Sequence, residues 1–461
     1  MNELDKIKHI YFLGIGGIGM SALARYFNSK GAIVMGYDKT ETPLTKQLVE
    51  EGIAVHYEDN VALLDTEAQL VVYTPAVPVE LHEYKYYHIN NYKMVKRSDV
   101  LGMITESSFN ICIAGTHGKT TTSTMTAHIL RHSGYGCNAF LGGIAVNYDA
   151  NFWSQAPGGS SEKNVAVAEA DEYDRSFLKL SPDIAVISSM DPDHLDIYGT
   201  AEKMEEAFIE FAGKIKKGGM LLSKYGLKRN ADLHADHHLT YHLNDEKADA
   251  HAMNIKMENG SYRFDLKIKD AVIKDIVLNM GGMHNIENAN AAITIAHHLG
   301  IDEEKIKKAV YDFRGVKRRF EYIVKNDDQV FVDDYAHHPE ELRALIKGAK
   351  ALFADKKCTV VFQPHLYTRT RDLADGFAEV LDLADEVILL PIYPARELPI
   401  EGVSSEMILN KMKSGHKQVL EKQALINWIK NNRTELLVTA GAGDIDTLLE
   451  TIKSQIENRK S

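Results

Sequence analysis

A glycine-rich loop in the middle of the chain contains the residues best suited to phosphate chemistry. In a loop of this kind backbone amides cradle phosphates, a lysine reaches the β- and γ-phosphates, and a threonine hydroxyl binds Mg²⁺. The loop departs from the common P-loop pattern, because Ile113 stands where its first glycine would be. The pattern favours a nucleoside triphosphate site over a tight turn without a ligand. The loop consists of Gly115, Thr116, His117, Gly118, Lys119, Thr120 and Thr121.

Two further groups are candidate ligands for a divalent cation. Glu169 ends an apolar run, and His194 follows the next such run. Because the carboxyl ends of parallel strands meet at one edge of a sheet, we expect both side chains near the phosphate loop. Taken singly, Glu169 could be a helix cap or a surface acid. His194, taken singly, could be a hydrogen-bonded histidine in a turn. Together they predict a Mg²⁺ site.

A second glycine-rich loop lies near the N-terminus and matches G-x-G-x-x-G between a strand and a helix. Its glycines let backbone amides approach a diphosphate at the positive end of the helix. Asp38, at the end of the next strand, is placed to bond a ribose hydroxyl. The pattern fits an NAD(P) oxidoreductase as well as a nucleotide-sugar site. The loop consists of Gly14, Ile15, Gly16, Gly17, Ile18 and Gly19.

Polar clusters recur in the second half of the chain. His284 and Asn285 precede an alanine-rich helix, where they would suit contact with an adenine or, for Asn285, helix capping. The basic run 317–319 is a candidate for phosphate contact or a solvated charge run. The clusters 333–339 and 362–371 each follow a strand and contain His and Arg, which suits a small carboxylate such as an amino acid.

Strands alternating with helices must position these loops. Apolar runs at residues 9–14, 33–37 and 70–73 alternate with helical patterns, and the alternation returns after residue 109 and again after residue 330. This alternation is typical of parallel α/β sheets. At roughly 150 residues per domain the 461 residues suggest about three domains. We place the boundaries so that the domains are 1–106, 107–315 and 316–461.

Composition narrows the class of protein. Lys+Arg is 53 and Asp+Glu is 65, so the net charge is −12 and a basic nucleic-acid surface is not expected. The chain has 3 cysteines, which argues against a disulfide scaffold, and Cys112 is expected in the core. No signal peptide and no transmembrane run is expected, which predicts a cytoplasmic protein. Residues 234–242 contain four histidines, but we interpret them as an irregular, solvated surface and not as a zinc site.

The ordered motifs resemble the Mur ligases of bacterial cell-wall synthesis, and within them the alanine-adding branch. The matching segments are LGIGGIGMSALA, GTHGKTTT, EADEYDRSF, DPDHLDIYG, MHNIENANAA, GVKRRFE, DDYAHHPEE, FQPHLYTRTRDL and TAGAGDI. The resemblance implies an α/β protein of three domains: an N-terminal Rossmann-like domain for a UDP-sugar, a central P-loop ATPase-type parallel sheet, and a C-terminal Rossmann-like domain for the amino acid. It implies ATP-dependent ligation of L-alanine to UDP-N-acetylmuramate through an acyl phosphate, by a monomer or weak homodimer.

The resemblance also implies roles for single residues. Lys119 would hold the γ-phosphate through transfer, while Thr120, Glu169 and His194 would bind Mg²⁺. In the N-terminal domain the UDP-sugar would contact Gly14, Gly16, Gly17, Ile18, Gly19, Asp38 and Thr74.

In the second half of the chain, His284 and Asn285 would contact the adenine, and Asn288 would belong to the ATP-binding residues. Arg319 would reach the phosphates of ATP, and Asp334 would bond its ribose. The alanine would lie near His337, His365 and Arg369, with one of the two histidines taking the proton of the amine.

Two departures from the family pattern matter. Sister ligases often have a carbamoylated lysine about fifteen positions after the metal-binding histidine, where this chain has 208–210 without a lysine. Many members have a basic residue where this chain has Leu366, so Arg369 becomes the better candidate for the alanine carboxylate.

Three alternatives remain open at this point. A recycling ligase that attaches a preformed tripeptide to the same UDP-sugar would share the fold and chemistry. An NAD(P) oxidoreductase would leave the phosphate loop, Glu169 and His194 unexplained. A P-loop switch protein would leave the first glycine loop without a role.

Overall fold

The N-terminal part of the computed structural model is a parallel sheet that holds the first glycine loop. The structure describes residues 3–156, 160–161, 163–395 and 397–458. The five strands lie in the order β3-β2-β1-β4-β5, and all neighbours pair in parallel. The elements are β1 (His9–Leu13), α1 (Ile18–Ser29), β2 (Ile33–Tyr37), α2 (Pro43–Glu50), β3 (Ala54–His56), β4 (Leu70–Tyr73), α3 (His82–Ile89), β5 (Met94–Lys96) and α4 (Arg97–Glu106).

The central part is a ten-stranded sheet in the order β15-β14-β13-β12-β11-β10-β6-β9-β7-β8. The strands around the phosphate loop pair in parallel, and β8 is antiparallel to β7. The first elements are β6 (Phe109–Ala114), α5 (Lys119–His132), β7 (Asn138–Ala145), β8 (Ala150–Trp153), β9 (Val165–Glu169), β10 (Ile184–Ile187), α6 (Leu195–Tyr198), α7 (Ala201–Ala212) and β11 (Met220–Lys224). They are followed by β12 (His237–His242), β13 (Ala250–Glu258), β14 (Ser261–Ile268), β15 (Ala271–Leu278), α8 (Met283–His298) and α9 (Glu303–Asp312).

The C-terminal part is a six-stranded sheet in the order β16-β17-β21-β18-β19-β20, parallel except for the edge strand β16. Its strands are β16 (Glu321–Lys325), β17 (Val330–Asp334), β18 (Cys358–Phe362), β19 (Glu386–Leu389), β20 (Lys417–Val419) and β21 (Leu436–Ala440). Its helices are α10 (Pro339–Leu352), α11 (Tyr367–Leu381), α12 (Ser405–Lys411), α13 (Lys422–Asn431) and α14 (Leu449–Glu457). The predicted α/β class with three parallel-rich sheets is confirmed.

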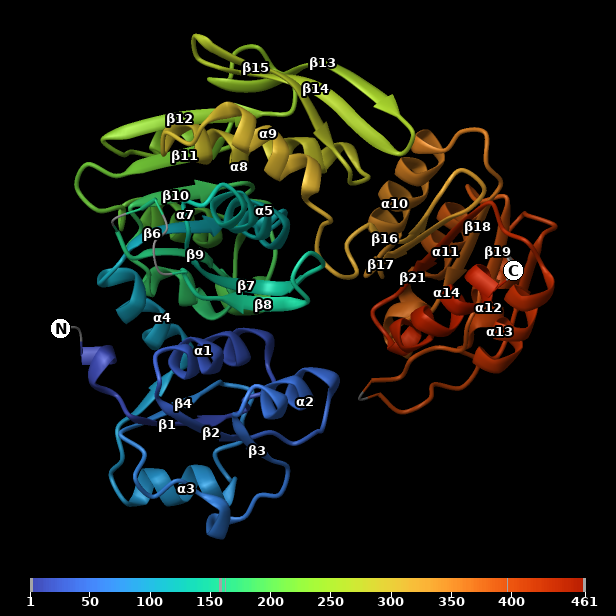
Figure 1. Ribbon diagram of the computed structural model, residues 1–461. Helices are drawn as coiled ribbons and strands as arrows, with labels where there is room; N and C mark the ends of the chain where they lie inside the picture. The colour runs from blue at the N-terminus through green and yellow to red at the C-terminus, as the bar shows by residue number, and fades with distance from the viewer. Residues whose placement is uncertain (1–2, 157–159, 162, 396, 459–461) are drawn as a thin grey trace. The chain divides into compact units, whose positions relative to one another are not determined.

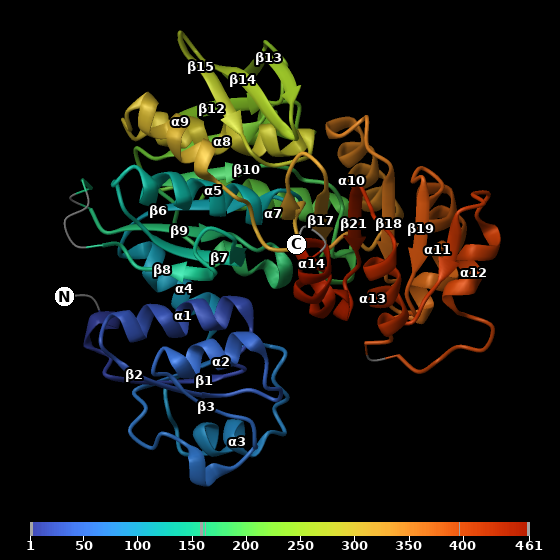
Figure 2. The same ribbon diagram turned by 45° about the vertical axis from the view of Figure 1, so that its right-hand side comes forward.

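One hydrophobic core joins the N-terminal and central sheets. It contains Phe12 of β1 and Leu23 of α1 from the N-terminal part, and Phe140, Phe152 and Phe177 from the central part. Helix α1 lies against β7 and β8 in both views of the ribbon (Figures 1 and 2). The glycine loop that opens α1 is thereby fixed relative to the central sheet.

By its internal contacts the chain divides into two compact units. The first comprises residues 1–253, 265–276 and 287–311, and the second comprises 254–264, 277–286 and 312–461. The first unit contains both glycine-rich loops, and the second contains the two C-terminal His and Arg clusters. The two boundaries between the three domains that we placed from the sequence stay a prediction.

The interpretation of residues 234–242 as irregular is wrong for most of that segment. His237–His242 form β12, which pairs with β11 in the register Met220↔His237. The His238 ring bonds the Ser223 hydroxyl at 2.8 Å, and burial lowers the pKa of His238. Only Tyr241 of this strand is fully buried, which explains a pattern that looked merely polar. Cys112 is fully buried, as expected.

Two structural absences are relevant to function. Among the residues described, no group of three or more His, Cys, Asp or Glu side chains is arranged to hold a metal ion. Within that same part of the chain, no helix combines the length and the apolar character needed to cross a membrane.

Candidate active site

The phosphate loop connects β6 to α5 and is held by the end of the neighbouring strand β10. Gly115 has a φ of +129°, and a Cβ there would collide with the Ser188 hydroxyl, so only glycine fits. Ser189 Oγ accepts the His117 amide at 2.8 Å and bonds Thr116 Oγ at 2.8 Å. Sequence reasoning missed both serines, although their place directly after a buried strand was a usable signal.

Lys119 begins α5 and does not extend into solvent. Its Nζ lies 2.7 Å from Glu172 Oε2, 2.8 Å from Oε1 and 2.7 Å from the Gly115 carbonyl oxygen. Glu172 is 1% exposed. The sequence motif contained this glutamate, but nothing in the pattern distinguished it from its acidic neighbours.

Helix α8 brings one of its three predicted ATP-binding residues, Asn288, to the phosphate loop. Thr122 Oγ donates to Asn288 Oδ1 at 3.2 Å, and a Cβ on Gly118 would lie 2.6 Å from that oxygen. Asn285 is buried and its amide donates to the Gly281 carbonyl at 2.6 Å, as a residue of a helix start does. His284 is exposed in the first turn of α8. Contact of these residues with an adenine stays a prediction.

Glu169 ends β9 next to the strand that leads into the phosphate loop. The pairing register sets Glu169 beside Ile113, and the Ala170 amide donates to the Ile113 carbonyl at 2.8 Å. The carboxylate lies directly over Gly142 of β7, where any Cβ would collide with its oxygens. Gly142, which the sequence did not single out, therefore makes room for this carboxylate.

His194 follows β10 in a left-handed turn, with φ +49°. Its ring packs edge-on against Tyr173 at 5.2 Å between centroids. The Thr120 hydroxyl and the Glu169 carboxylate are hard oxygen donors, and Mg²⁺ binds proteins through few such groups and fills the rest of its shell with water and phosphate oxygens. The donor chemistry of these residues therefore fits Mg²⁺, with His194 as a weaker, nitrogen ligand.

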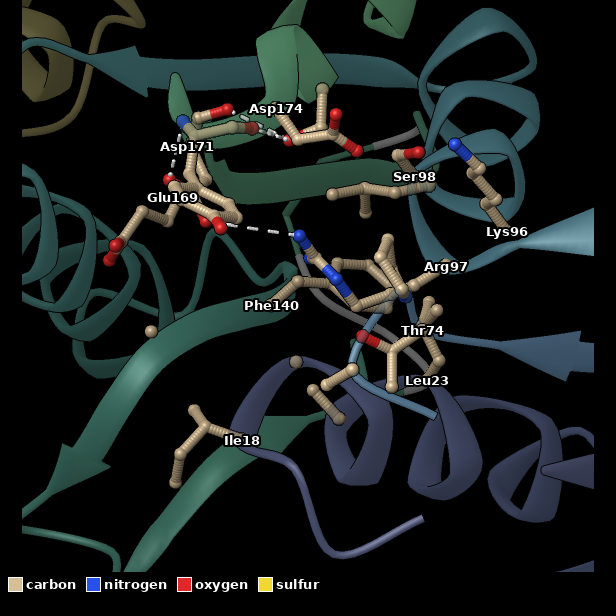
Figure 3. A pocket seen from close by; sticks show the side chains of 18 of the residues that line it. Ile18, Leu23, Thr74, Lys96, Arg97, Ser98, Phe140, Glu169, Asp171 and Asp174 are labelled. Carbon is tan, nitrogen blue, oxygen red and sulfur yellow. Dashed lines mark hydrogen bonds and ion pairs between the residues drawn. The ribbon is translucent and has the colours of Figure 1, made fainter. Parts of the chain in front are cut away.

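A cavity of about 480 Å³ lies where α1 and the β4–α4 region meet the central sheet; we call it the inter-sheet cavity (Figure 3). Three predicted sugar-site residues line it, namely Ile18, Gly19 and Thr74. Glu169, predicted as a metal ligand, lines the same cavity. Further lining residues include Lys96, Arg97, Ser98, Phe140, Asp171, Tyr173 and Asp174.

Arg97 is a functional candidate that sequence reasoning missed. It begins α4, lines the inter-sheet cavity and forms an ion pair with Asp171 at 3.9 Å, drawn as a dashed line in Figure 3. A Cβ on Gly19 would lie 2.9 Å from its guanidinium, so the cation sits against the start of α1. A guanidinium at the positive end of a helix makes a strong anion site. In the sequence, only its position in the polar segment Lys96-Arg97-Ser98, directly after a short strand, indicated a functional role.

Asp38 organises the first glycine loop in this structure. Its carboxylate accepts the Gly16 amide at 2.8 Å and the Thr40 amide at 3.2 Å. A Cβ on Gly16 would lie 2.8 Å from the same carboxylate. Gly14, Gly16, Gly17 and Asp38 form the loop beside the inter-sheet cavity but are not among its lining residues. Ribose binding by Asp38 stays a prediction.

The C-terminal unit brings the predicted alanine-site residues together. The rings of His337 and His365 are 6.3 Å apart, and Arg369 Nη1 lies 3.4 Å from His365 Nδ1. Tyr393 stacks on His365 at 5.8 Å. Burial, and then the charges of Arg369 and His337, hold the pKa of His365 below its ordinary value, while Glu397 opposes the shift. The neutral form of this imidazole is therefore favoured.

Hydrogen bonds assign different tautomers to the two histidines. His337 Nδ1 lies 3.0 Å from the Tyr335 carbonyl oxygen, which can only accept, so Nδ1 carries the proton and Nε2 a lone pair. His365 Nδ1 faces the Arg369 guanidinium, which can only donate, so its lone pair on Nδ1 is already engaged. Of the two rings, His337 is better prepared to accept a proton.

Acidic groups at the end of β17 are held by the basic run that precedes β16. Asp333 is fully buried, accepts from Arg318 Nε at 3.1 Å and from the Thr439 hydroxyl at 2.6 Å, and burial raises its pKa to about 7. Asp334 accepts the amides of Phe320 at 2.7 Å and Ala336 at 2.8 Å. Burial raises the pKa of Asp334 to about 6.

The expected roles of two residues in this region stay untested. Asp334 is engaged by backbone amides, which makes it an organiser of the loop before α10. Ribose contact by Asp334 and phosphate contact by Arg319 stay predictions.

Comparisons with known proteins agree along the whole chain. Three family models match in order: "Mur ligase family, catalytic domain" over residues 9–108, "Mur ligase middle domain" over 113–296, and "Mur ligase, glutamate ligase domain" over 318–445. A UDP-N-acetylmuramate–L-alanine ligase of Christiangramia forsetii is 45% identical, with 99% of each chain covered.

Solved structures show the same likeness. The UDP-N-acetylmuramate–alanine ligase of Thermotoga maritima matches with a TM-score of 0.80 and 28% identity, covering 98% of this chain and 99% of that one. A murein peptide ligase of Psychrobacter arcticus matches with a TM-score of 0.65 and 23% identity, covering 98% of this chain and 99% of that one, which shows a shared fold.

Proposed function

The chain belongs to the Mur ligase family, and we propose that it joins L-alanine to UDP-N-acetylmuramate with conversion of ATP to ADP and phosphate. The product, UDP-N-acetylmuramoyl-L-alanine, is a precursor of peptidoglycan. Relatives that are 44–48% identical over 98–99% of this chain carry the name of that activity. The proposed setting is the cytoplasm, where ATP and UDP-sugars are available, and the proposed oligomeric state is a monomer or weak homodimer.

One observation supports this function most directly. The inter-sheet cavity is lined on one side by Ile18, Gly19 and Thr74 and on the other by Glu169. Strand β9, which Glu169 ends, pairs with the strand that leads into the phosphate loop. A UDP-sugar carboxylate in this cavity would therefore lie on the side of the sheet where a γ-phosphate binds, which is what an acyl-phosphate ligase requires and an oxidoreductase does not.

The first chemical step activates the sugar carboxylate. A carboxylate resists nucleophiles because of its charge, so one of its oxygens attacks the γ-phosphorus, ADP leaves, and an acyl phosphate forms. Lys119 places a positive charge at the phosphate loop, and the loop amides contribute further donors to the transferring group. Arg97 and the N-terminus of α1 hold the UDP diphosphate and so orient the carboxylate toward the γ-phosphate.

Thr120 and Glu169, with His194, would hold Mg²⁺, which neutralises phosphate charge when bound. Because Gly142 has no side chain, the Glu169 carboxylate can occupy the space over β7. The residues of the chain thus determine where a cation can sit relative to the inter-sheet cavity.

The second step forms the amide bond. Arg369 binds the carboxylate of alanine, and the amine nitrogen attacks the acyl carbon, after which phosphate leaves and the nitrogen gives up a proton. His337 accepts that proton at Nε2, because its Nδ1–H is held by the Tyr335 carbonyl. His365, with its Nδ1 engaged by Arg369, orients this guanidinium.

The recycling ligase that attaches a preformed tripeptide is the less favoured candidate. Its fold is shared, as the murein peptide ligase of Psychrobacter arcticus shows, but that protein is 23% identical, whereas the alanine ligases of the family reach 48%. The fold by itself does not separate the two activities.

Phosphate release tests the proposal. ATP and Mg²⁺ are supplied with UDP-N-acetylmuramate and L-alanine, separately and together, and the product is weighed by mass spectrometry. We expect release only when both acceptors are present, and near-complete loss in Lys119→Ala. Release with the tripeptide in place of alanine would move the assignment to the recycling ligase, and no release with either would refute ligase activity.

A further inference from the structure

The lysine of the phosphate loop has a buried acidic partner. Lys119 Nζ is within 2.8 Å of both oxygens of Glu172 and 2.7 Å from the Gly115 carbonyl. The Glu172 residue is 1% exposed, and the Lys119 side chain is 13% exposed. An acid at this place opposes the binding of an anionic nucleotide and loses its own hydration, so its presence needs a physical reason.

The geometry of the ammonium supplies that reason. A lysine ammonium has three N–H donors and no acceptor. One donor is directed to the Glu172 carboxylate and one to the Gly115 carbonyl, and these two directions determine the third. A flexible four-carbon side chain is thereby converted into a donor of one orientation before any phosphate arrives.

Glu172 is itself anchored by backbone contacts. Its carbonyl oxygen accepts the Tyr198 hydroxyl at 2.6 Å and the Arg175 amide at 3.0 Å. Asp174 and Arg175 follow in left-handed conformations, with φ of +55° and +54°, a costly backbone that the surroundings must maintain. The Arg175 guanidinium lies 5.2 Å from the Tyr198 ring centre.

The same short segment lines the inter-sheet cavity. Asp171, Tyr173 and Asp174 are lining residues, whereas Glu172 between them is turned to Lys119. The segment therefore connects the cavity proposed for the UDP-sugar with the lysine proposed to act on the γ-phosphate.

We propose that Glu172 is a positioning residue for phosphoryl transfer, which stays paired with Lys119 when nucleotide binds and leaves the third N–H of the ammonium for the transferring phosphate. This inference rests on the proposed function for its kinetic part. Because Glu172 acts through Lys119, its removal affects the rate of transfer and not the affinity for ATP.

The variant Glu172→Gln tests this by separating binding from rate. Glutamine keeps the shape and one acceptor oxygen but not the charge. We expect the Kd for ATP to stay within about 3-fold of wild type or to tighten, because a negative charge beside the triphosphate is removed. The single-turnover formation of ADP with UDP-N-acetylmuramate should fall roughly 10–100-fold, as misplaced catalytic groups do. Glu172→Asp, which keeps the charge but withdraws it by one methylene, should be slowed as well.

The matched control is Glu205→Gln. Glu205 is another buried carboxylate of the first unit, 4% exposed and paired with Lys228 at 2.9 Å, but outside the phosphate loop. It should leave the Kd and the transfer rate unchanged. An unchanged transfer rate in Glu172→Gln would overturn the proposal. A loss of ATP affinity in proportion to the loss of rate would overturn it as well, because such a loss indicates a damaged phosphate loop.

A stability cycle tests the pair without any reaction. Lys119→Met leaves the Glu172 charge buried and alone, so its Tm should fall by roughly 5 °C or more, and adding Glu172→Gln should restore most of the loss. No restoration in the double variant would overturn the pairing. Because this cycle and the ATP Kd need neither sugar nor alanine, failure of the proposed function would appear separately, as a wild type that binds ATP and releases no phosphate.

Discussion

At the scale of single residues, hydrogen-bond direction decides roles that the residue types leave open. His337 and His365 are both histidines after strands, and nothing in their order along the chain distinguishes them. The carbonyl beside His337 and the guanidinium beside His365 assign opposite tautomers to the two rings. The proton acceptor is therefore assigned by neighbours two and four residues away within the same clusters, through a geometry that the residue types alone do not give.

The first prediction separates the two rings. His337→Gln removes the proton acceptor, so amide formation should slow roughly 10²–10⁴-fold, the usual contribution of general base catalysis. The first-turnover burst of ADP should remain, because acyl phosphate formation does not need this ring. His365→Gln should mainly raise the KM for alanine. Rapid-quench measurement of ADP and product checks this, and a rate loss confined to His365→Gln would reverse the assignment.

The second prediction concerns pH. Burial and the Arg369 charge lower the pKa of His365, so the ring stays neutral to a lower pH than an ordinary histidine. As pH falls through that pKa the ring gains a charge that faces Arg369 and repels the ammonium of alanine, so alanine kcat/KM falls. Arg369→Gln removes one cause of the lowering, the pKa rises, and the acid limb moves to higher pH.

The control for the pH profile is Arg371→Gln. Arg371 is exposed and paired with Asp372 at 2.7 Å, so it should leave the acid limb where it is in wild type. If the acid limb of Arg369→Gln lay at the same pH as in wild type, the Arg369 charge would not be a cause of the lowered pKa of His365.

At the scale of elements, neighbouring strands hold the loops by contacts that each strand alone does not reveal. Strand β7 offers Gly142 to the Glu169 carboxylate at the end of β9, and the residues after β10 hold the phosphate loop after β6. These contacts depend on which strands are neighbours, that is, on the order β10-β6-β9-β7.

The third prediction tests the contact between β7 and β9. Gly142→Ala places a Cβ against the Glu169 carboxylate and displaces it. We expect turnover to fall roughly 100-fold and the Mg²⁺ concentration for half-maximal rate to rise, because the predicted metal ligand moves. Gly415→Ala, at a glycine with open space around it, is the control. A normal Mg²⁺ titration in Gly142→Ala would contradict a metal role for Glu169.

The fourth prediction tests the connection between the phosphate loop and β10. Ser189→Ala leaves the partly buried His117 amide without its acceptor, which costs about 1 kcal/mol and should weaken ATP binding roughly 5-fold. Calorimetric titration with ATP measures this. Ser133→Ala, whose hydroxyl bonds Leu130 O at 3.2 Å at the far end of α5, should bind ATP normally. Equal affinities in the two variants would show that the loop does not depend on Ser189.

At the scale of the whole molecule, two sheets act as one body because they share a core and a buried polar contact. Asn151 of β8 is fully buried, donates to the Ile18 carbonyl at 2.6 Å and to Ser21 Oγ at 2.9 Å, and accepts from Arg25. Ile18 lines the inter-sheet cavity. The shape of that cavity is therefore a property of the docking of α1 on the central sheet.

The fifth prediction follows from this docking. Asn151→Leu keeps the side-chain volume but leaves the buried Arg25 donor without its acceptor. The free energy of unfolding of the first unit should therefore fall by about 1–3 kcal/mol. The Tm should fall by roughly 2–10 °C and the KM for the UDP-sugar should rise. The control is Asn28→Ala. Asn28 lies on α1, as Arg25 does, but its side chain donates to the Glu51 carbonyl at an exposed place, so the Tm and the KM should change little. An unchanged KM in Asn151→Leu would show that the docking of α1 does not shape the cavity.

The sequence by itself determined the class of fold, most strand positions and the chemistry of the loops. The runs at residues 9–14 and 70–73 agree with β1 and β4 to within a residue, because strands buried on both faces are continuous apolar segments that local pattern reveals. The glycine loops were predictable for a similar reason, since positive φ and close approach to phosphate each demand glycine at a set spacing. Strand β12 escaped because, of the residues His237–His242, only Tyr241 is buried, so the segment has no apolar run.

Only the tertiary structure decided which side chains meet. The pairing of Lys119 with Glu172, the place of Arg97 in the inter-sheet cavity and the space above Gly142 depend on the order of strands and the docking of α1. None of these contacts joins residues that are close in the sequence. Burial and contacts of this kind are set by long-range neighbours, so they are properties of the folded chain and not of any motif within it.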